Sequence, residues 1–233
     1  MTHKDVSWVL GRATLGNLAG VMSRVRVYGR DRVPREGGLV VALNHFSWID
    51  IPLFAIANPR NTSFVAKAEA HRIPGLGQFI REFDSFAIRR GESDREAVRR
   101  MREVVRDGGC LGVFVEGTRQ RSGVPGVVQP GAAMVAVKEQ VPIVCGAIHG
   151  SQTWKLGNFH RVTIAWGEPW TVGELTRDEV SARIKDEIET LWRWLVEMHE
   201  QGRRPLRATP PPSSARSRSS ASPTSASPPS STA

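Results

Sequence analysis

Cysteine is scarce in this chain, and several patterns that mark other classes of protein are absent. The two cysteines, Cys110 and Cys145, stand in apolar surroundings and are too far apart for the ligand spacing of a zinc site. We therefore expect buried, inert thiols in a reducing compartment and no bound metal. No stretch approaches the roughly 18 apolar residues of a membrane-spanning helix. The N-terminus lacks the features of a signal peptide, and no G-x-S-x-G elbow of a serine hydrolase occurs.

Acidic residues are also missing from residues 203–233, where large apolar residues are almost absent. This segment is rich in Pro, Ser, Ala and Thr and contains five arginines. It cannot bury enough surface to offset the entropy of ordering, so we expect a disordered tail. The tail carries five of the nine net positive charges and leaves +4 on residues 1–202. Such moderate basicity suits phosphate, acidic lipid or nucleic acid, and charge alone does not choose among them.

The rest of the chain alternates between strand-like and helical patterns. The whole sequence has 40% hydrophobic and 24% charged residues, which fits one globular domain. We expect strands at 25–28, 39–43, 63–66, 86–88, 110–115, 143–148 and 162–166. We expect helices at 51–57 and 132–138, one capped by Ser93 and Glu96, and a last one capped by Thr176 and Glu179. This order predicts a single-domain α/β fold with a largely parallel or mixed central sheet flanked by helices.

Residues 6–25 form an amphipathic helical pattern with a polar side. Two interpretations are open, because such a helix either lies in a membrane interface or packs on the domain. Residues 1–24 are therefore a candidate membrane-interface anchor.

A histidine and an aspartate follow the expected strand 39–43, in the segment N-H-F-S-W-I-D at 44–50. A carboxylate that binds one nitrogen of an imidazole fixes its tautomer and supports general-base chemistry. His45 and Asp50 would lie about 140° apart on one helix, so the pair requires His45 in a loop and Asp50 at a helix start. The alternative is that Ser47 or Asp50 caps the helix and His45 is a buried, hydrogen-bonded residue.

The loop after the expected strand 110–115 contains E-G-T-R at 116–119. Gly117 allows close approach of the backbone to a ligand, Thr118 offers a hydroxyl, and Arg119 presents a planar fork suited to phosphate. Glu116 would repel phosphate, so we expect it to orient Arg119 or to bind a substrate hydroxyl. The alternative is a solvated turn with an ion pair between Glu116 and Arg119.

Two adjacent arginines, Arg89 and Arg90, end the apolar run 86–88. Side chains alternate along a strand, so one of the two should face the site. The arginines of the following helix are interspersed with acidic residues and are typical of a solvated face.

Four ordered blocks together are more specific than any one of them: N-H-x-S-x-x-D, an arginine closing an apolar run, F-x-E-G-T-R, and V-P-I-V at 141–144. This order resembles the glycerolipid acyltransferase family, most closely the bacterial 1-acylglycerol-3-phosphate acyltransferases, over residues 25–170. The resemblance implies a glycerol-3-phosphate acyltransferase-like fold and makes residues 25–202 the acyltransferase domain. Two residues depart from the family pattern. The family usually has proline at the position of Val115 and often at the position of Cys145.

The resemblance also implies roles for individual residues. His45 would be the general base and Asp50 would orient it. Block four is associated with binding of the acyl donor or with support of the site. The residues implicated in binding the glycerol phosphate group are Arg90, Glu116, Gly117, Thr118 and Arg119.

The implied reaction moves a fatty acyl group from acyl-CoA or acyl-carrier protein to the free hydroxyl of 1-acylglycerol 3-phosphate. The product, phosphatidic acid, would enter phospholipid biosynthesis, and no cofactor, metal or nucleic acid is implied. Because the acceptor is an amphiphile, we expect peripheral or monotopic association with the cytoplasmic face of the cell membrane. Two alternatives are an acyltransferase with another lysolipid or alcohol acceptor and a non-enzymatic module that binds anionic lipid.

Overall fold

The computed structural model describes residues 13–14, 17–67, 86–88, 94–202 and 207–213. Its strands are β1 (Arg26–Tyr28), β2 (Leu39–Leu43), β3 (Ser63–Lys67), β4 (Phe86–Ile88), β5 (Cys110–Phe114), β6 (Ile143–His149) and β7 (Thr163–Trp166). Its helices are α2 (Asn17–Met22), α3 (Asp50–Ala57), α5 (Asp94–Arg106), α6 (Gly131–Glu139) and α7 (Arg177–Glu200), with short 3-10 turns η2 (Arg30–Arg32) and η4 (Ser151–Thr153). The expected strands are confirmed to within one residue at each end.

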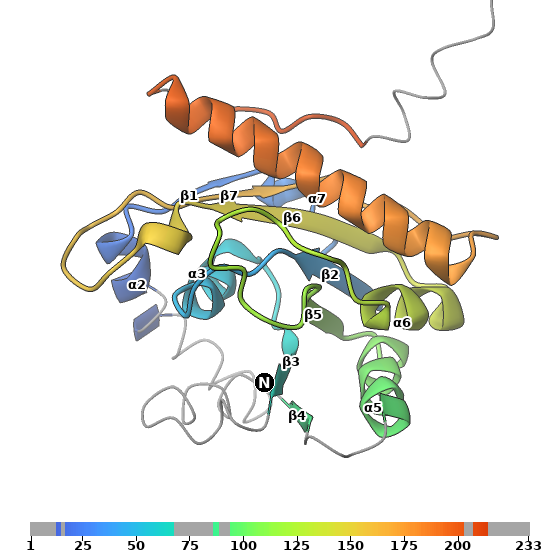
Figure 1. Cartoon of the computed structure of the whole chain (residues 1–233). Coiled ribbons are helices and arrows are strands. Elements are labelled where there is room, and N and C mark those ends of the chain that lie inside the picture. Colours follow the sequence, from blue (N-terminus) through green and yellow to red (C-terminus); the bar gives the residue numbers. More distant parts are fainter. Residues whose placement is uncertain (1–12, 15–16, 68–85, 89–93, 203–206, 214–233) are drawn as a thin grey trace, which may run out of the picture.

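One mixed sheet organises the molecule, in the order β1-β7-β6-β2-β5-β3-β4 (Figure 1). Neighbouring strands are parallel except for β6 and β7, which are antiparallel. The α/β fold with a largely parallel or mixed sheet is thus confirmed. Strand β2 lies at the centre and is buried along its whole length, as its unbroken apolar sequence predicts.

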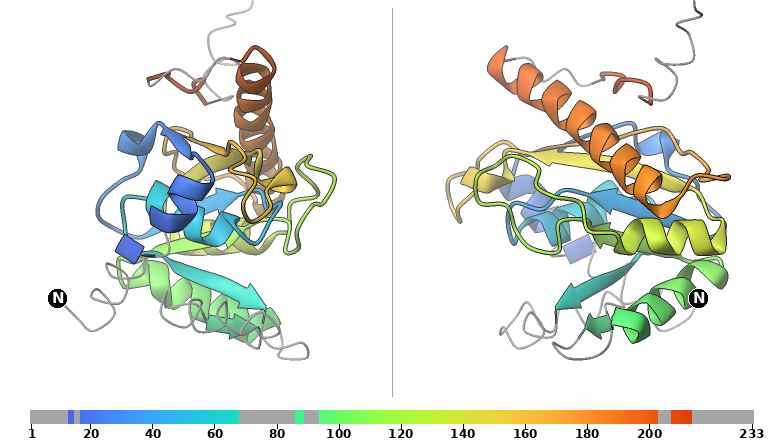
Figure 2. Two further views of the ribbon diagram at one scale, coloured as in Figure 1. Left: turned by 90° about the vertical axis from the view of Figure 1, so that its left-hand side faces the viewer. Right: turned by 45° about the vertical axis from the view of Figure 1, so that its right-hand side comes forward.

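Helices cover both faces of the sheet, which gives three layers (Figures 1 and 2). Helices α5, α6 and α7 pack on one face, where the apolar stripe of α7 meets β6. Helix α3 packs on the other face, with α2 beside it. The predicted capping box of α7 is confirmed, because the Glu179 N–H donates to Thr176 Oγ1 and the Glu179 carboxylate accepts from the Thr176 N–H.

The N-terminal helical pattern lies only partly within the described residues. Helix α2 buries Ala19 and Gly20, and Gly20 lies against Ile56 of α3. Leu18 and Val21 are exposed on the opposite side of the same helix. Packing on the domain is therefore confirmed for one side of α2. None of the helices within the described ranges is both long and apolar enough to cross a membrane.

Residues 207–213, within the expected disordered tail, pack on the domain. The guanidinium of Arg32 donates to the carbonyl oxygens of Pro210 (2.9 Å) and Pro211 (3.3 Å). Ser213 is buried, donates to the Glu187 carboxylate and accepts from Arg183. The expectation of disorder was wrong for these seven residues, because carbonyl groups and a hydroxyl, rather than large apolar side chains, hold them in place. The remainder of the tail, 203–206 and 214–233, lies outside the described residues.

Candidate active site

The two loops that carry the predicted residues leave the sheet at the same edge, because β2 and β5 are adjacent parallel strands. His45 lies two residues after β2, and Glu116 lies two residues after β5. The buried side chain of Asn44 joins this edge to β6, since its Nδ2 donates to the Ile148 carbonyl (2.9 Å) and its Oδ1 accepts from the Ile148 N–H (2.8 Å). We did not predict this role for Asn44, although an amide directly after a buried strand was a usable signal.

Asp50 opens α3 and holds His45 through a single carboxylate oxygen. Its Oδ2 accepts from His45 Nδ1 (2.8 Å) and from the backbone N–H groups of Phe46 (2.7 Å) and Ser47 (2.8 Å). An ionised carboxylate can only accept, so Nδ1 carries the proton of the neutral imidazole and Nε2 carries the lone pair. The Asp50 side chain is fully buried, whereas 13% of the His45 side chain is exposed. The pair therefore has the arrangement of a general base and its orienting carboxylate.

The alternative in which a polar side chain caps α3 was wrong. The N-cap of α3 is Ile49, and it makes no side-chain cap bond. Asp50 lies inside the first turn, and its carboxylate reaches back toward the loop that carries His45. The expectation of His45 in a loop and Asp50 at the start of the helix is confirmed.

The imidazole of His45 lies against an aromatic ring. Phe114, the last residue of β5, stacks on it with ring centroids 4.2 Å apart and an interplanar angle of 22°. Phe114 packs in turn near Phe64 and Phe54. The imidazole is thus fixed by a carboxylate at Nδ1 and by an apolar surface along one face. Periodicity in the sequence predicts Phe114 only as part of a strand, so this contact was not foreseen.

Glu116 braces the backbone of the site. Its Oε2 accepts from the His45 N–H (2.7 Å), and its Oε1 accepts from the Gly126 N–H (2.8 Å). The His45 carbonyl accepts from the Gln120 N–H (2.7 Å), so the loop after β5 holds both backbone groups of His45. Burial raises the pKa of Glu116 to about 7, although the two backbone hydrogen bonds oppose this shift.

This arrangement corrects our interpretation of Glu116. Within the described residues the carboxylate makes no ion pair with Arg119, so it does not orient that guanidinium, and the alternative of an ion pair in the turn was wrong as well. Glu116 shapes the site by joining the loop after β2 to the loop after β5.

Arg119 lies on the indole of Trp48. Its guanidinium carbon is 4.0 Å from the ring centroid, which is a cation–π contact between the two loops. Burial lowers the pKa of Arg119, and the neighbouring Arg121 adds to this effect. Gly117 adopts a left-handed conformation (φ 65°) that turns the chain, and Thr118 is exposed. Arg119 and the exposed Thr118 thus belong to the loop that contacts the His45 backbone through the Gln120 N–H.

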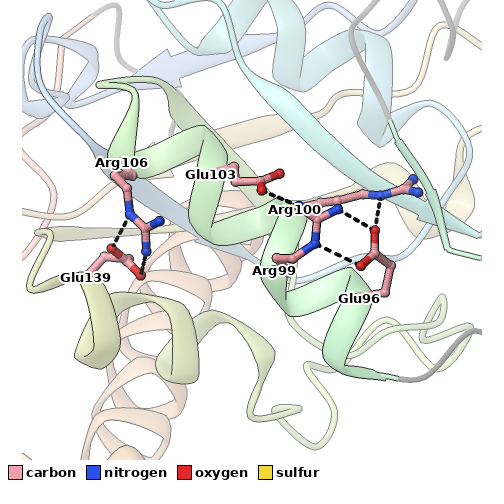
Figure 3. Close-up of polar contacts among 6 residues, drawn as sticks. All are labelled: Glu96, Arg99, Arg100, Glu103, Arg106 and Glu139. Atoms are coloured by element: carbon pink, nitrogen blue, oxygen red, sulfur yellow. Dashed lines mark hydrogen bonds and ion pairs between the residues drawn. The ribbon is translucent and has the colours of Figure 1, made fainter.

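Arg89 and Arg90 lie outside the described residues, so the prediction for Arg90 stays a prediction. Four arginines of α5 whose side chains the structure describes lie on the expected charged face, and Figure 3 shows Arg99, Arg100 and Arg106 among them. Arg99 and Arg100 pair with Glu96, and Arg99 also pairs with Glu103. Arg102 and Arg106 pair with Glu139 of α6, which links the two helices. These four arginines thus pair with carboxylates of α5 and α6.

Both cysteines are buried and free, as predicted. Burial raises the pKa of the Cys110 thiol and that of the Cys145 thiol, which keeps them protonated and poorly nucleophilic. Among the residues that the structure describes, no cluster of three or more His, Cys, Asp or Glu side chains could hold a metal ion.

Comparison with known proteins places this chain beside lipid acyltransferases. A family model described as Acyltransferase matches residues 24–149, more than half of the chain, including His45, Asp50 and 116–119. The crystal structure of the 1-acyl-sn-glycerophosphate acyltransferase from Thermotoga maritima has a similar fold, with a TM-score of 0.63, 24% sequence identity and coverage of 80% of this chain and 81% of that chain.

Three curated proteins are similar in sequence over part of the chain. A 1-acyl-sn-glycerol-3-phosphate acyltransferase of Bacillus subtilis is 26% identical over 147 residues, which span 62% of this chain and 73% of the relative. A lyso-ornithine lipid O-acyltransferase of Pseudomonas aeruginosa is 38% identical over 101 residues, or 43% of this chain and 37% of the relative. A 1-acyl-sn-glycerol-3-phosphate acyltransferase of Borreliella burgdorferi is 24% identical over 143 residues, or 60% of this chain and 56% of the relative.

Proposed function

The chain belongs to the acyltransferase family, and we propose that it moves a fatty acyl group from acyl-CoA or acyl-carrier protein to the free hydroxyl of 1-acylglycerol 3-phosphate. The product is phosphatidic acid, which serves phospholipid biosynthesis. The observation that carries the proposal is the hydrogen bond from His45 Nδ1 to Asp50 Oδ2 (2.8 Å), beside a loop suited to phosphate. The names of the Bacillus subtilis and Borreliella burgdorferi relatives support the choice of acceptor.

The proposed chemistry needs no enzyme nucleophile. The Nε2 lone pair of His45 takes the proton from the acceptor hydroxyl, while the hydroxyl oxygen attacks the thioester carbonyl and forms a tetrahedral intermediate. Asp50 stabilises the imidazolium that results. The intermediate then collapses, the carbon–sulfur bond breaks, and the imidazolium returns the proton to the departing thiolate. His45 ends the cycle neutral, with the acyl group on the acceptor oxygen.

Binding of the glycerol phosphate falls to the loop after β5 in this proposal. Arg119 offers paired N–H donors, Thr118 offers a hydroxyl, and Gly117 leaves room for the backbone to approach. Arg90 is proposed as a second cation for the same phosphate. Glu116 takes part indirectly, through its hydrogen bond to the backbone of His45.

An amphiphilic acceptor brings the protein to a membrane surface. We propose peripheral or monotopic association with the cytoplasmic face of the cell membrane, with residues 1–24 as one anchoring element. The exposed Leu18 and Val21 of α2 support this role, because they are apolar and do not pack on the domain.

A second acceptor is favoured by one observation. The lyso-ornithine lipid O-acyltransferase of Pseudomonas aeruginosa has the higher identity, 38%, over its shorter match. Lyso-ornithine lipid is therefore the second candidate acceptor for the same His45 chemistry.

The test measures release of free CoA thiol from acyl-CoA by the purified protein, with each acceptor and without any. Release that depends on 1-acylglycerol 3-phosphate and is lost in folded His45→Ala protein supports the proposal. Faster release with lyso-ornithine lipid selects the second acceptor. Release without any acceptor indicates a thioesterase, whereas no transfer to either acceptor from acyl-CoA or from acyl-carrier protein indicates a binding module.

A further inference from the structure

The segment between η4 and β7 is a short, braced loop that exposes two large apolar side chains. Leu156 is 79% exposed and Phe159 is 47% exposed. Both belong to residues 154–161, here called the 154–161 loop. Single exposed apolar residues are normal on protein surfaces, so exposure alone does not indicate a binding surface.

The shape of the 154–161 loop is well determined by its own hydrogen bonds. The Asn158 side chain donates to the Thr153 carbonyl (3.0 Å) and accepts from the His160 N–H (3.1 Å), while the Asn158 N–H donates to the Lys155 carbonyl (3.1 Å). Phe159 is held at φ 45°, a left-handed conformation that is rare for a bulky residue. Strain of this kind persists where the surrounding structure over-determines it and is concentrated at functional positions.

The 154–161 loop lies at the same edge of the sheet as His45. Strands β2 and β6 are parallel neighbours, and the paired hydrogen bonds between Asn44 and Ile148 join their ends. The end of the loop is also tied to the end of α2, because the Val162 N–H donates to the Ser23 carbonyl (2.9 Å). Figure 1 shows α2 and this loop together on the left-hand side, and the left view of Figure 2 turns that side toward the reader.

The exposed charges of the 154–161 loop have one sign. Lys155 and Arg161 flank the two apolar residues and are exposed. Residues 150–167, which contain this loop, include no Asp or Glu, and the two carboxylates beside His45 at this edge, Asp50 and Glu116, are buried. Exposed aliphatic and aromatic side chains between cations match the headgroup region of an anionic bilayer, where apolar groups insert and cations meet phosphate.

We propose that the 154–161 loop docks on an anionic lipid bilayer, with Leu156 and Phe159 inserted and Lys155 and Arg161 among the headgroups. The exposed side of α2 extends the same surface. This inference rests on the proposed function only in that a lipid acceptor gives a reason for the contact. Docking through this edge would present His45 to the acceptor at the membrane surface.

The test is sedimentation of the full chain with vesicles of phosphatidylcholine and phosphatidylglycerol in equal amounts. The variant Leu156→Ser/Phe159→Ser should bind these vesicles roughly tenfold more weakly than the wild type, because two apolar side chains no longer insert. Val127→Ser is the matched control: Val127 is 77% exposed but lies beside Ser181 and Lys185 of α7, and its loss should leave binding unchanged. Thermal melts establish that each variant is folded.

A charge variant tests the choice of lipid. Lys155→Glu/Arg161→Glu should lose binding to the mixed vesicles and change little on pure phosphatidylcholine, since only the anionic surface attracts the two cations. Added salt should weaken wild-type binding to the mixed vesicles for the same reason.

Three outcomes would overturn the proposal. The first is a wild-type protein that does not sediment with the mixed vesicles, and the second is a Leu156→Ser/Phe159→Ser variant that binds as well as the wild type. The third is a Leu156→Ser/Phe159→Ser variant that binds vesicles like the wild type but loses turnover only when an acidic acyl-carrier protein is the donor. That result would make the loop a protein-docking surface. His45→Ala separates this proposal from the proposed function, because it should abolish transfer and leave vesicle binding intact.

Discussion

At the scale of single residues, Asp50 fixes the ring of His45 and the backbone beside it with one oxygen atom. Because Oδ2 accepts from Nδ1 and from two backbone N–H groups, the tautomer of the imidazole and the position of the loop are set together. The ring of His45 is thus held in position before any substrate arrives. Proposed catalytic groups need this kind of preorganisation.

Asp50→Asn should therefore lower kcat by about 10² to 10⁴, because a neutral amide oxygen in the place of Oδ2 no longer stabilises the imidazolium that forms. Steady-state kinetics with acyl-CoA and acceptor measure the loss. Asp107→Asn, at an exposed position after α5, is the matched control and should retain activity. Wild-type kcat in a folded Asp50→Asn protein would remove the orienting role.

Trp48 is the positioning residue for Arg119, through the 4.0 Å cation–π contact. Trp48→Ala should raise KM for a phosphate-bearing acceptor roughly fivefold, as expected from a contact of about 1 kcal/mol, with little change in kcat. Trp48→Phe keeps an aromatic face and should restore most of the affinity. An equal rise in KM for an acceptor without phosphate would show that Trp48 acts in another way.

Glu116 should make stability depend on pH. Its folded-state pKa is about 7 against an ordinary value of 4.5, so the folded protein holds a proton that the unfolded chain releases first. The contribution is fully present below pH 4.5 and is lost as the pH rises through 7, a change on the order of 3 kcal/mol.

Urea unfolding of the wild type and of Glu116→Gln at several pH values measures this contribution. The wild type should lose stability relative to Glu116→Gln as the pH rises from 4.5 to above 7. Glu174→Gln, at an exposed position before α7, should follow the wild type. A constant difference between the wild type and Glu116→Gln would contradict the raised pKa.

At the scale of elements, the sequence predicts the strands better than their directions. Residues 39–43 are an unbroken β-branched and aliphatic run bounded by glycine and asparagine, so β2 could be assigned residue by residue. The antiparallel pairing of β7 with β6 could not be predicted, because side chains alternate in the same way along a parallel and an antiparallel strand. The hydrogen bonds from the His45 and Gly126 N–H groups to Glu116 were also missed. They depend on how the loops fold against each other, which the sequence pattern does not show.

Composition alone misled us about residues 207–213. Proline carbonyls and Ser213 bind Arg32, Arg183 and Glu187, and none of these contacts needs a large apolar side chain. The buried Glu187 carboxylate would lose the Ser213 hydroxyl if this segment were removed.

A pair of truncations tests this packing. A chain ending at Gly202 should be less stable than a chain ending at Ser213 by about 1 to 3 kcal/mol, the usual cost of removing partners from buried polar groups. Urea unfolding at neutral pH measures the difference. Equal stabilities would mean that the segment contributes nothing to the fold.

At the scale of the whole molecule, the site follows from the order of the strands. The central strand β2 is covered on both faces, and the loops after β2, β5 and β6 meet at one edge. His45 projects from this rigid platform next to the buried carboxylates of Asp50 and Glu116, and the 154–161 loop at the same edge exposes Lys155 and Arg161. The exposed cations at this edge favour the anionic acceptor that we propose.

We propose that His45 activates the hydroxyl of a lysolipid. The most direct measurement follows transfer of an isotopically labelled acyl group from acyl-CoA to 1-acylglycerol 3-phosphate by mass spectrometry, with wild-type and folded His45→Gln protein. We expect labelled phosphatidic acid from the wild type and a rate lower by about 10² to 10⁴ for His45→Gln. Labelled product at the wild-type rate from His45→Gln, or a labelled acyl group on the protein itself, would contradict it.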